Sequence, residues 1–320
     1  MAGITVLTRS ATTFKADSSI DEEAYRAHLQ RLVDARLGVY LASGGSGEGY
    51  ALADSELCRL YEIGVDACKG QVPVYANPPE GHTATETIRQ AQMAVAAGVE
   101  AVCIYGPAGR HDYKPNAVEY ARHLDTVLGA VDHPVALSPN PWATNGFRPS
   151  ARLFAEICNR HENVEVVNLN LASLEDSYLI QLNDLLTRDG IRVYVPIRGS
   201  FHTLGLGAAG LLGNHANVIP RTFRHYIDLY EAAKYDEMNS VYADIRRFDK
   251  FTNYWGGSPL WIKMAMRVLK LPGAAGGVRA PFVLPGADQL AKFTTGLLAL
   301  RNPEIDEMAR AAGLEVPERG

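Results

Sequence analysis

Short apolar segments alternate with amphipathic segments along the first 220 residues, and the apolar segments begin about every 30 residues, the size of a unit of one strand and one helix. Eight such units are the number in a (β/α)8 barrel, in which parallel strands close on themselves and helices surround them. The expected strands cover residues 4–8, 39–43, 72–77, 101–106, 134–139, 164–170, 192–197 and 210–214.

Amphipathic segments with helical spacing fill the gaps between the expected strands. Asp21, Ser55 and Ser150 stand where a capping side chain would accept hydrogen bonds from the first free backbone N–H groups of a helix. Only a short helix fits between the last two strands, at residues 200–207. The other expected helices cover residues 21–35, 55–69, 84–97, 116–130, 150–160 and 173–188.

The pattern changes after Pro220, where only helical patterns follow, interrupted by glycine and proline at residues 254–258 and 271–285. The sequence therefore predicts an α/β protein with two domains. Residues 1–220 form a (β/α)8 TIM barrel, and residues 221–320 form an all-helical C-terminal domain with a tail.

Charge and apolar content restrict the partners that we expect. The net charge of −5 and the scattered basic residues do not favour nucleic acid. No apolar run reaches the roughly 18–20 residues that cross a bilayer, and the first residues lack a signal-peptide pattern. The four cysteines include no Cys-x-x-Cys pair, which is typical of a reducing compartment. We expect a cytoplasmic protein that acts on a small molecule.

The sixth expected strand ends in two asparagines, Asn168 and Asn170, and contains no lysine. Side chains two residues apart on a strand point the same way, so the two amides should project together. Because a buried amide without partners costs about 1–3 kcal/mol, they form either a polar site or a hydrogen-bonded pair.

Several segments together resemble the dihydrodipicolinate synthase / N-acetylneuraminate lyase family. Gly-Gly-Ser-Gly-Glu at residues 44–48 is similar to the Gly-Thr-Thr-Gly-Glu of that family, and the acidic residues 54–56 are similar to the helix start after it. Residues 210–220 resemble the last strand of that family and the Ala-Asn-x-x-Pro segment that follows it. Residues 261–263 and 278–281 resemble its C-terminal helical segment and Arg-x-Pro. The resemblance implies the same barrel and a homotetramer or homodimer.

The chemistry that the resemblance implies is altered here. Family members form a Schiff base on a sixth-strand lysine, where this chain has Asn168, or Asn170 with a two-residue shift. The tyrosine of the fifth strand falls on Ser138, and the threonine pair has become Gly45-Ser46.

Two further family positions differ. The expected arginine falls near Ala143, with Arg148 as the closest substitute, and Tyr113 alone stands near the expected aromatic pair. Besides the lysine, four elements of one mechanism are thus changed together, which indicates that the usual reaction is lost. One alternative keeps a Schiff base on a relocated lysine, Lys15 or Lys114, which lie on loops at the expected active face.

Polar residues at strand ends and following loops are the candidates for a site, because barrel active sites are built there. The expected catalytic residues are Asn168, Asn170, Ser138, His215 and Glu48. The expected substrate-binding residues are Gly45, Ser46, Tyr113, His111, Asn140, Arg148 and Asn214.

Each candidate also has a structural interpretation. Glu48 can brace its loop, His215 can be a core histidine on the last strand, and the glycine-rich residues 44–49 can make a tight turn. A metal site made by His111, His202 and His215 with Glu48 would need these side chains to come together in space, which their spacing in the sequence does not show. We expect no metal and no cofactor.

Two classes of function follow from these residues. We expect an enzyme that acts on a small oxo- or hydroxy-acid-like substrate without a lysine, by acid–base chemistry that cleaves or forms a carbon–carbon bond or adds or removes water. The alternative is a catalytically inactive homologue that binds a ligand or regulates an active relative.

Overall fold

A computed structural model describes residues 3–171 and 175–317 of the chain. Its strands close into a barrel in the order β1 to β8, so the (β/α)8 prediction is confirmed. All eight strands lie where the sequence predicts them, with ends that differ by a few residues. They are β1 Thr5–Arg9, β2 Gly38–Leu41, β3 Val74–Ala76, β4 Ala101–Tyr105, β5 Val135–Ser138, β6 Val164–Asn168, β7 Arg192–Pro196 and β8 Gly210–Leu212.

A helix follows each strand. The short helix predicted before the last strand is present as α7, and residues 173 and 174 of the expected sixth helix lie outside the described residues. The barrel helices are α1 Glu22–Asp34, α2 Asp54–Cys68, α3 Ala84–Ala96, α4 Ala117–Ala130, α5 Ala151–Arg160, α6 Glu175–Leu185, α7 Ser200–Gly205 and α8 Pro220–Glu231.

Two of the three predicted helix caps are present. The Asp21 side chain accepts a hydrogen bond from Ala24 N (3.0 Å), and Ser150 Oγ accepts one from Leu153 N (3.2 Å). The third prediction, Ser55, is wrong. The helix begins one residue earlier, and Ala53 N donates to Glu56 Oε2 (3.0 Å), so a first-turn carboxylate satisfies the free N–H group.

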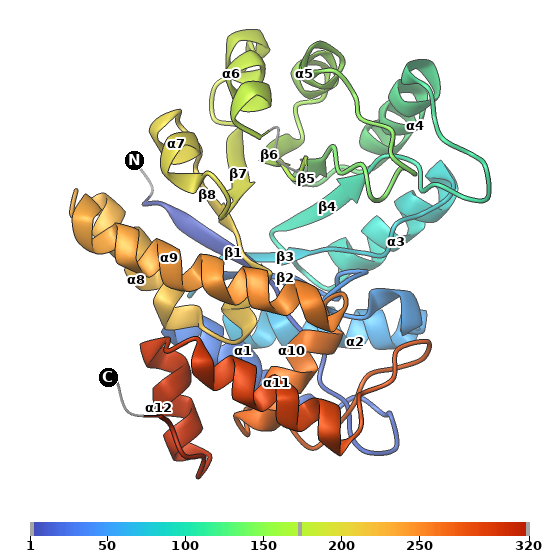
Figure 1. Cartoon of the computed structure of the whole chain (residues 1–320). Helices are drawn as coiled ribbons and strands as arrows, with labels where there is room; N and C mark the ends of the chain where they lie inside the picture. The colour runs from blue at the N-terminus through green and yellow to red at the C-terminus, as the bar shows by residue number, and fades with distance from the viewer. Residues whose placement is uncertain (1–2, 172–174, 318–320) are drawn as a thin grey trace. The chain divides into compact units, whose positions relative to one another are not determined.

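The chain divides into two compact units. The first consists of residues 1–5 and 74–212, and the second of residues 6–73 and 213–320. In the first unit, helices α3 to α7 lie on the outer side of the strands from β3 onward (Figure 1). The chain enters this unit again at Val74, so β3 is its first complete strand.

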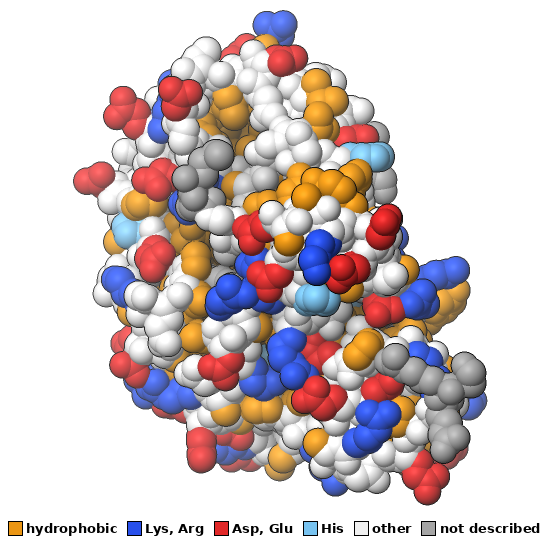
Figure 2. Space-filling model, turned by 90° about the vertical axis from the view of Figure 1, so that its left-hand side faces the viewer, with side chains coloured by type: hydrophobic (Ala, Val, Ile, Leu, Met, Phe, Trp, Pro, Cys, Tyr) orange, Lys and Arg blue, Asp and Glu red, His pale blue; other side chains and the backbone are white. Residues whose placement is uncertain are grey.

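The second unit contains the predicted C-terminal helices, α9 Tyr235–Thr252, α10 Leu260–Val268, α11 Ala287–Ala299 and α12 Pro303–Ala311. Aromatic side chains hold them together: the Phe293 ring of α11 lies 5.2 Å from that of Phe251 and 5.3 Å from that of Trp255. None of the helices in residues 3–171 and 175–317 is both long and apolar enough to cross a bilayer. On the face shown in Figure 2, acidic and basic side chains are intermixed.

Candidate functional site

Asn168 lies inside the barrel. It is the last residue of β6 and is fully buried, and its Nδ2 lies 3.6 Å from Sγ of Cys103 on β4. Because β5 separates β4 from β6, a contact between their side chains crosses the interior, where alternate strands contribute to one layer. The sixth strand therefore ends with a buried amide pointing inward.

Three further polar side chains stand at neighbouring strand ends in the same unit. Tyr105 lies two residues beyond Cys103 on β4 and so faces the same side, and its hydroxyl donates to Asn77 Oδ1 (3.1 Å). Tyr105 is also the register partner of Ser138, whose Oγ donates to the Asn168 carbonyl oxygen (3.1 Å). We call Asn77, Tyr105, Ser138 and Asn168 the strand-end cluster; all four side chains are buried.

Sequence reasoning did not single out Tyr105. The sequence points to Tyr113 as the aromatic residue after the fourth strand. Tyr113 is exposed, whereas the buried hydroxyl belongs to Tyr105, the last residue of that strand. The available signal was position, because the final residue of a barrel strand is where functional side chains occur.

Asn170 does not share the placement of Asn168. The strand ends at Asn168, and Asn170 is half-buried in the following segment, so the alternation that would align the two amides no longer applies.

The other candidates of the first unit lie in loops. The Asn140 side chain accepts from Trp142 N (3.1 Å), and Arg148 donates to the Leu171 carbonyl oxygen (3.0 Å). His111 and Tyr113 are exposed, and their carbonyl oxygens accept hydrogen bonds from Asn145. These contacts shape the loops.

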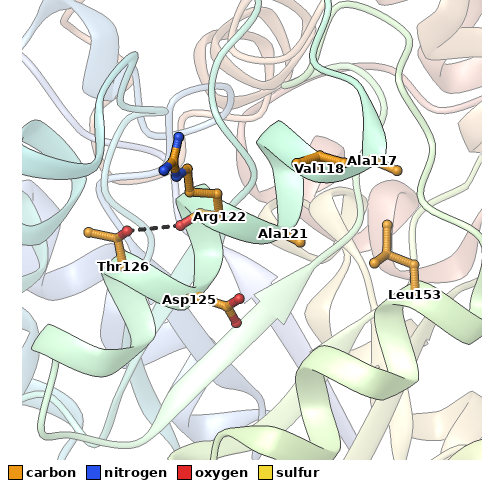
Figure 3. Close-up of a pocket in the computed structure, with 7 residues that line it drawn as sticks. All are labelled: Ala117, Val118, Ala121, Arg122, Asp125, Thr126 and Leu153. Atoms are coloured by element: carbon orange, nitrogen blue, oxygen red, sulfur yellow. Dashed lines mark hydrogen bonds between the residues drawn. The ribbon is translucent and has the colours of Figure 1, made fainter.

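A surface groove of about 640 Å³ in this unit lies away from the strand ends. Figure 3 shows its wall, made by α4 residues from Ala117 to Thr126 and by Leu153 of α5. Thr126 Oγ1 donates to the Arg122 carbonyl oxygen within α4. None of its lining residues is a predicted site residue, so we do not assign the chemistry to it.

In the second unit, Glu48 belongs to a buried ion pair. Its Oε1 lies 3.3 Å from Nζ of Lys263 on α10, and its Oε2 accepts from Arg279 N (2.7 Å). Lys263 also donates to the carbonyl oxygens of Thr12 and Gly277. Burial raises the pKa of Glu48 and lowers the pKa of Lys263, and in each case the partner's charge opposes the shift.

The Arg279 guanidinium completes this charged network. It forms two 2.6 Å hydrogen bonds to the carboxylate of Glu56 at the start of α2 and lies 4.5 Å from the ring centre of Phe14. Segments 44–48, 54–56, 261–263 and 278–281, which carry the family resemblance, thus meet in one place. The contacts favour a bracing role for Glu48.

Lys15 and Lys114, the two candidates for a relocated nucleophile, are both exposed. Of the eight lysines, all within the described residues, only Lys263 is buried. Its ammonium has three donors and faces three acceptors, on Thr12, Gly277 and Glu48, so it serves as a structural cation.

The glycine-rich residues 44–49 form a tight turn, as one interpretation of the sequence predicted. A Cβ added to Gly47 would lie 2.5 Å from Ser43 N, and Gly47 N donates to Ser43 Oγ (3.0 Å). Ser46, beside Gly45, is buried, and its Oγ has no hydrogen-bond partner among the described residues.

The predicted placement of Asn214 and His215 on the last strand is wrong. The strand ends at Leu212, and the chain turns into the 3-10 helix η2 (Asn214–Asn217). His215 stacks on Trp261 with ring centres 4.6 Å apart, and its Nε2 lies 2.8 Å from Thr252 Oγ1. It packs among the C-terminal helices, because the turn at Gly213 directs it there.

Asn217, in the same 3-10 helix, fixes the end of β1. Its Nδ2 donates to the Arg9 carbonyl oxygen and its Oδ1 accepts from Ala11 N, both at 2.9 Å. Oδ1 also lies 2.9 Å from Nε2 of His28, which is fully buried. Burial lowers the pKa of His28 from 6.5 to about 3, so the folded protein holds this ring neutral.

We expect acid to destabilise the protein through His28. Below pH 6.5 the unfolded chain binds a proton that the folded chain does not, so His28 lowers stability as the pH falls from 6.5 to about 3, by about 1.4 kcal/mol per pH unit. Urea unfolding between pH 7 and pH 4 measures this slope. His28→Gln should have a shallower slope than the wild type, and equal slopes would contradict the assignment.

Residues 3–171 and 175–317 hold no group of three or more histidine, cysteine, aspartate or glutamate side chains placed to bind a metal ion. His111 is an exposed loop residue, His202 is exposed on the short helix α7, and His215 packs on Trp261. The four cysteines are all free thiols.

Comparisons with known proteins agree with this architecture. Residues 3–297 match the model of the Dihydrodipicolinate synthetase family. An uncharacterized DapA-like lyase of Rhizobium meliloti is 25% identical over 91% of this chain and 93% of its own length. A probable 5-dehydro-4-deoxyglucarate dehydratase of Methylobacterium radiotolerans is 26% identical over 77% of each chain. The solved structure of YagE, a prophage protein of E. coli K12 in complex with pyruvate, superposes with a TM-score of 0.83 at 20% identity, over 94% of this chain and 99% of that one.

Proposed function

Because the chain belongs to the dihydrodipicolinate synthetase family, we propose that it is a lyase that acts on a small oxo- or hydroxy-acid without forming a Schiff base. One observation carries the proposal: the interior end of β6 presents the amide of Asn168, and no lysine occurs in that strand. An amide can orient and polarise a carbonyl group, but it cannot form an imine.

The strand-end cluster supplies the groups that such a reaction needs. In cleavage of a hydroxy-oxo acid, a base removes the hydroxyl proton, the carbon–carbon bond breaks, and its electron pair moves onto the carbonyl oxygen as an enolate. The Asn168 N–H donates to that oxygen and stabilises the charge where it develops. The base is the oxygen of Tyr105, which gives its own hydroxyl proton to the enolate carbon as it takes the hydroxyl proton of the substrate, so the tyrosine is neutral again at the end.

Tyr105 is the proton carrier in this proposal. Its buried hydroxyl donates to Asn77 Oδ1, an acceptor that holds the proton in a fixed direction. It takes the place of the fifth-strand tyrosine, whose position here is Ser138, the register neighbour of Tyr105. The same two groups fit loss of water from a hydroxy acid, the reaction named for the Methylobacterium relative.

We expect Tyr105→Phe to lower kcat by about 10²- to 10⁴-fold with little change in KM, because it removes the carried proton but keeps the ring. The measurement is release of the smaller oxo acid or of water from a panel of hydroxy-oxo acids. Tyr254→Phe is the matched control, because that ring is 79% exposed.

An unchanged kcat in Tyr105→Phe would remove the tyrosine from the mechanism. Binding of an oxo acid without turnover in the wild type would instead support the inactive ligand-binding homologue. Two predictions from the sequence stay predictions: that the protein forms a homodimer or homotetramer, and that it is cytoplasmic.

A further inference from the structure

A small cavity lies between β4, α3 and the loop that runs from Pro78 to Gly81. It is largely enclosed, and its volume of about 10 Å³ is close to the space that one water-sized sphere occupies. Tyr105 of the strand-end cluster is one of the residues that line it. The cavity therefore adjoins the candidate site and has room for one small ligand.

Gln90 brings an acceptor without a partner to this cavity. The residue belongs to α3, lines the cavity and is 8% exposed. Its Oε1 is buried, and no described residue donates a hydrogen bond to it. A buried acceptor in this state costs about 1–3 kcal/mol, so a ligand that offers positive charge to this oxygen is favoured.

Two further side chains of the cavity wall offer oxygen acceptors. Thr87 Oγ1 donates its proton to the Thr83 carbonyl oxygen (3.0 Å), so toward the cavity it can only accept. Glu80 is half-buried, and no ion pair with a described residue balances its carboxylate. Pro78 and Pro79 before it have no N–H groups and present only carbonyl oxygens. The polar part of this wall is therefore rich in acceptors.

The loop that carries Glu80 is held in place. Ala108 N donates to the Gly81 carbonyl oxygen (3.0 Å), and Asn77 Nδ2 donates to that of Pro78 (3.4 Å). A Cβ added to Gly81 would lie 2.4 Å from Thr87 Oγ1, so only glycine lets the loop approach α3 this closely. The acceptors of the loop and of α3 thus surround one small space.

We propose that this cavity binds a monovalent cation of the size of K⁺. Carboxylate and carbonyl oxygens are the ligands of hard cations, and in K⁺ sites carbonyl oxygens replace the hydration shell of the ion. Mg²⁺ keeps several waters, for which a cavity of about 10 Å³ has no room. A water molecule can donate to two acceptors, but it leaves the charge of Glu80 unbalanced. The inference does not depend on the proposed function.

The test compares urea unfolding in potassium chloride and in choline chloride at equal ionic strength, because choline is too large for the cavity. The unfolding equilibrium constant of the wild type should fall about tenfold when the K⁺ concentration is about ten times its dissociation constant. Gln90→Leu should remove this dependence, and Glu80→Gln should weaken it. Gln92→Leu, on the exposed side of the same helix, is the matched control and should keep it.

A second measurement locates the ion. Crystals soaked in thallium(I), a strongly scattering substitute for K⁺, should show an anomalous peak in the cavity beside Gln90 Oε1. Equal stability of the wild type in the two salts would overturn the inference and indicate a water molecule instead. A K⁺ dependence that Gln90→Leu retains would also overturn it, because the ion would then bind elsewhere. If Gln90→Leu does not fold, the thallium peak decides. None of these results depends on turnover, so the proposed function stands or fails separately.

Discussion

Asn168→Lys is expected to trap pyruvate covalently when borohydride is added, whereas the wild-type protein gains no adduct. The substituted side chain would start from the interior end of β6, beside Cys103, where relatives with a Schiff base are expected to carry their lysine. Burial disfavours the charged ammonium and so provides the neutral amine that attacks a ketone. Intact mass spectrometry, followed by peptide mapping, detects the reduced adduct and its position.

Asn170→Lys is the matched control for this experiment. Its side chain lies past the end of the strand in a half-buried segment, so we expect no adduct there. An adduct in Asn170→Lys but not in Asn168→Lys would show that the two-residue shift is the correct alignment. An adduct on Lys15 or Lys114 of the wild type would show that the nucleophile has moved to a loop, and the lysine-free proposal would fail.

The second large effect concerns stability. Lys263→Met should lower the free energy of unfolding by about 3–5 kcal/mol, because it leaves the buried Glu48 carboxylate without its counter-charge. Urea unfolding followed by tryptophan fluorescence measures the change. Lys292→Met, on the exposed side of α11, should change stability by less than about 0.5 kcal/mol.

The double variant Glu48→Gln/Lys263→Met separates charge from packing. Glutamine keeps an acceptor for Arg279 N–H but carries no charge, so most of the lost stability should return. A double variant as unstable as Lys263→Met alone would show that the loss comes from the contacts of Lys263 with Thr12 and Gly277 instead.

The regular elements could be predicted from the sequence because they depend on local spacing. Strand and helix periods identified the eight units, and the short helix at residues 200–205 appeared where only a short one fits. Strand ends were less predictable. Gly213 turns the chain after Leu212, so His215 leaves the barrel and stacks on Trp261. Periodicity carries no information about where a turn begins.

The candidate site was partly predictable for the same reason. Asn168 and Ser138 were found because they end strands, and both belong to the strand-end cluster. Tyr105 was not found, although it is the last residue of its strand. An aromatic or basic residue at a strand end looks the same in sequence whether it faces inward or outward, and only contacts across the barrel distinguish the two.

The network around Glu48 has a consequence for how the chain acquires its fold during synthesis. Glu48 and Arg279 are 231 residues apart, yet the backbone N–H of one binds the carboxylate of the other. The turn after β2 leaves the ribosome long before α10 and the segment that follows it exist. Until Lys263 and Arg279 have been synthesised, the carboxylate of Glu48 in this turn lacks the two groups that it binds in the folded protein. The buried carboxylate of Glu48 therefore gains its counter-charge and its backbone donor only after the last third of the chain has been made.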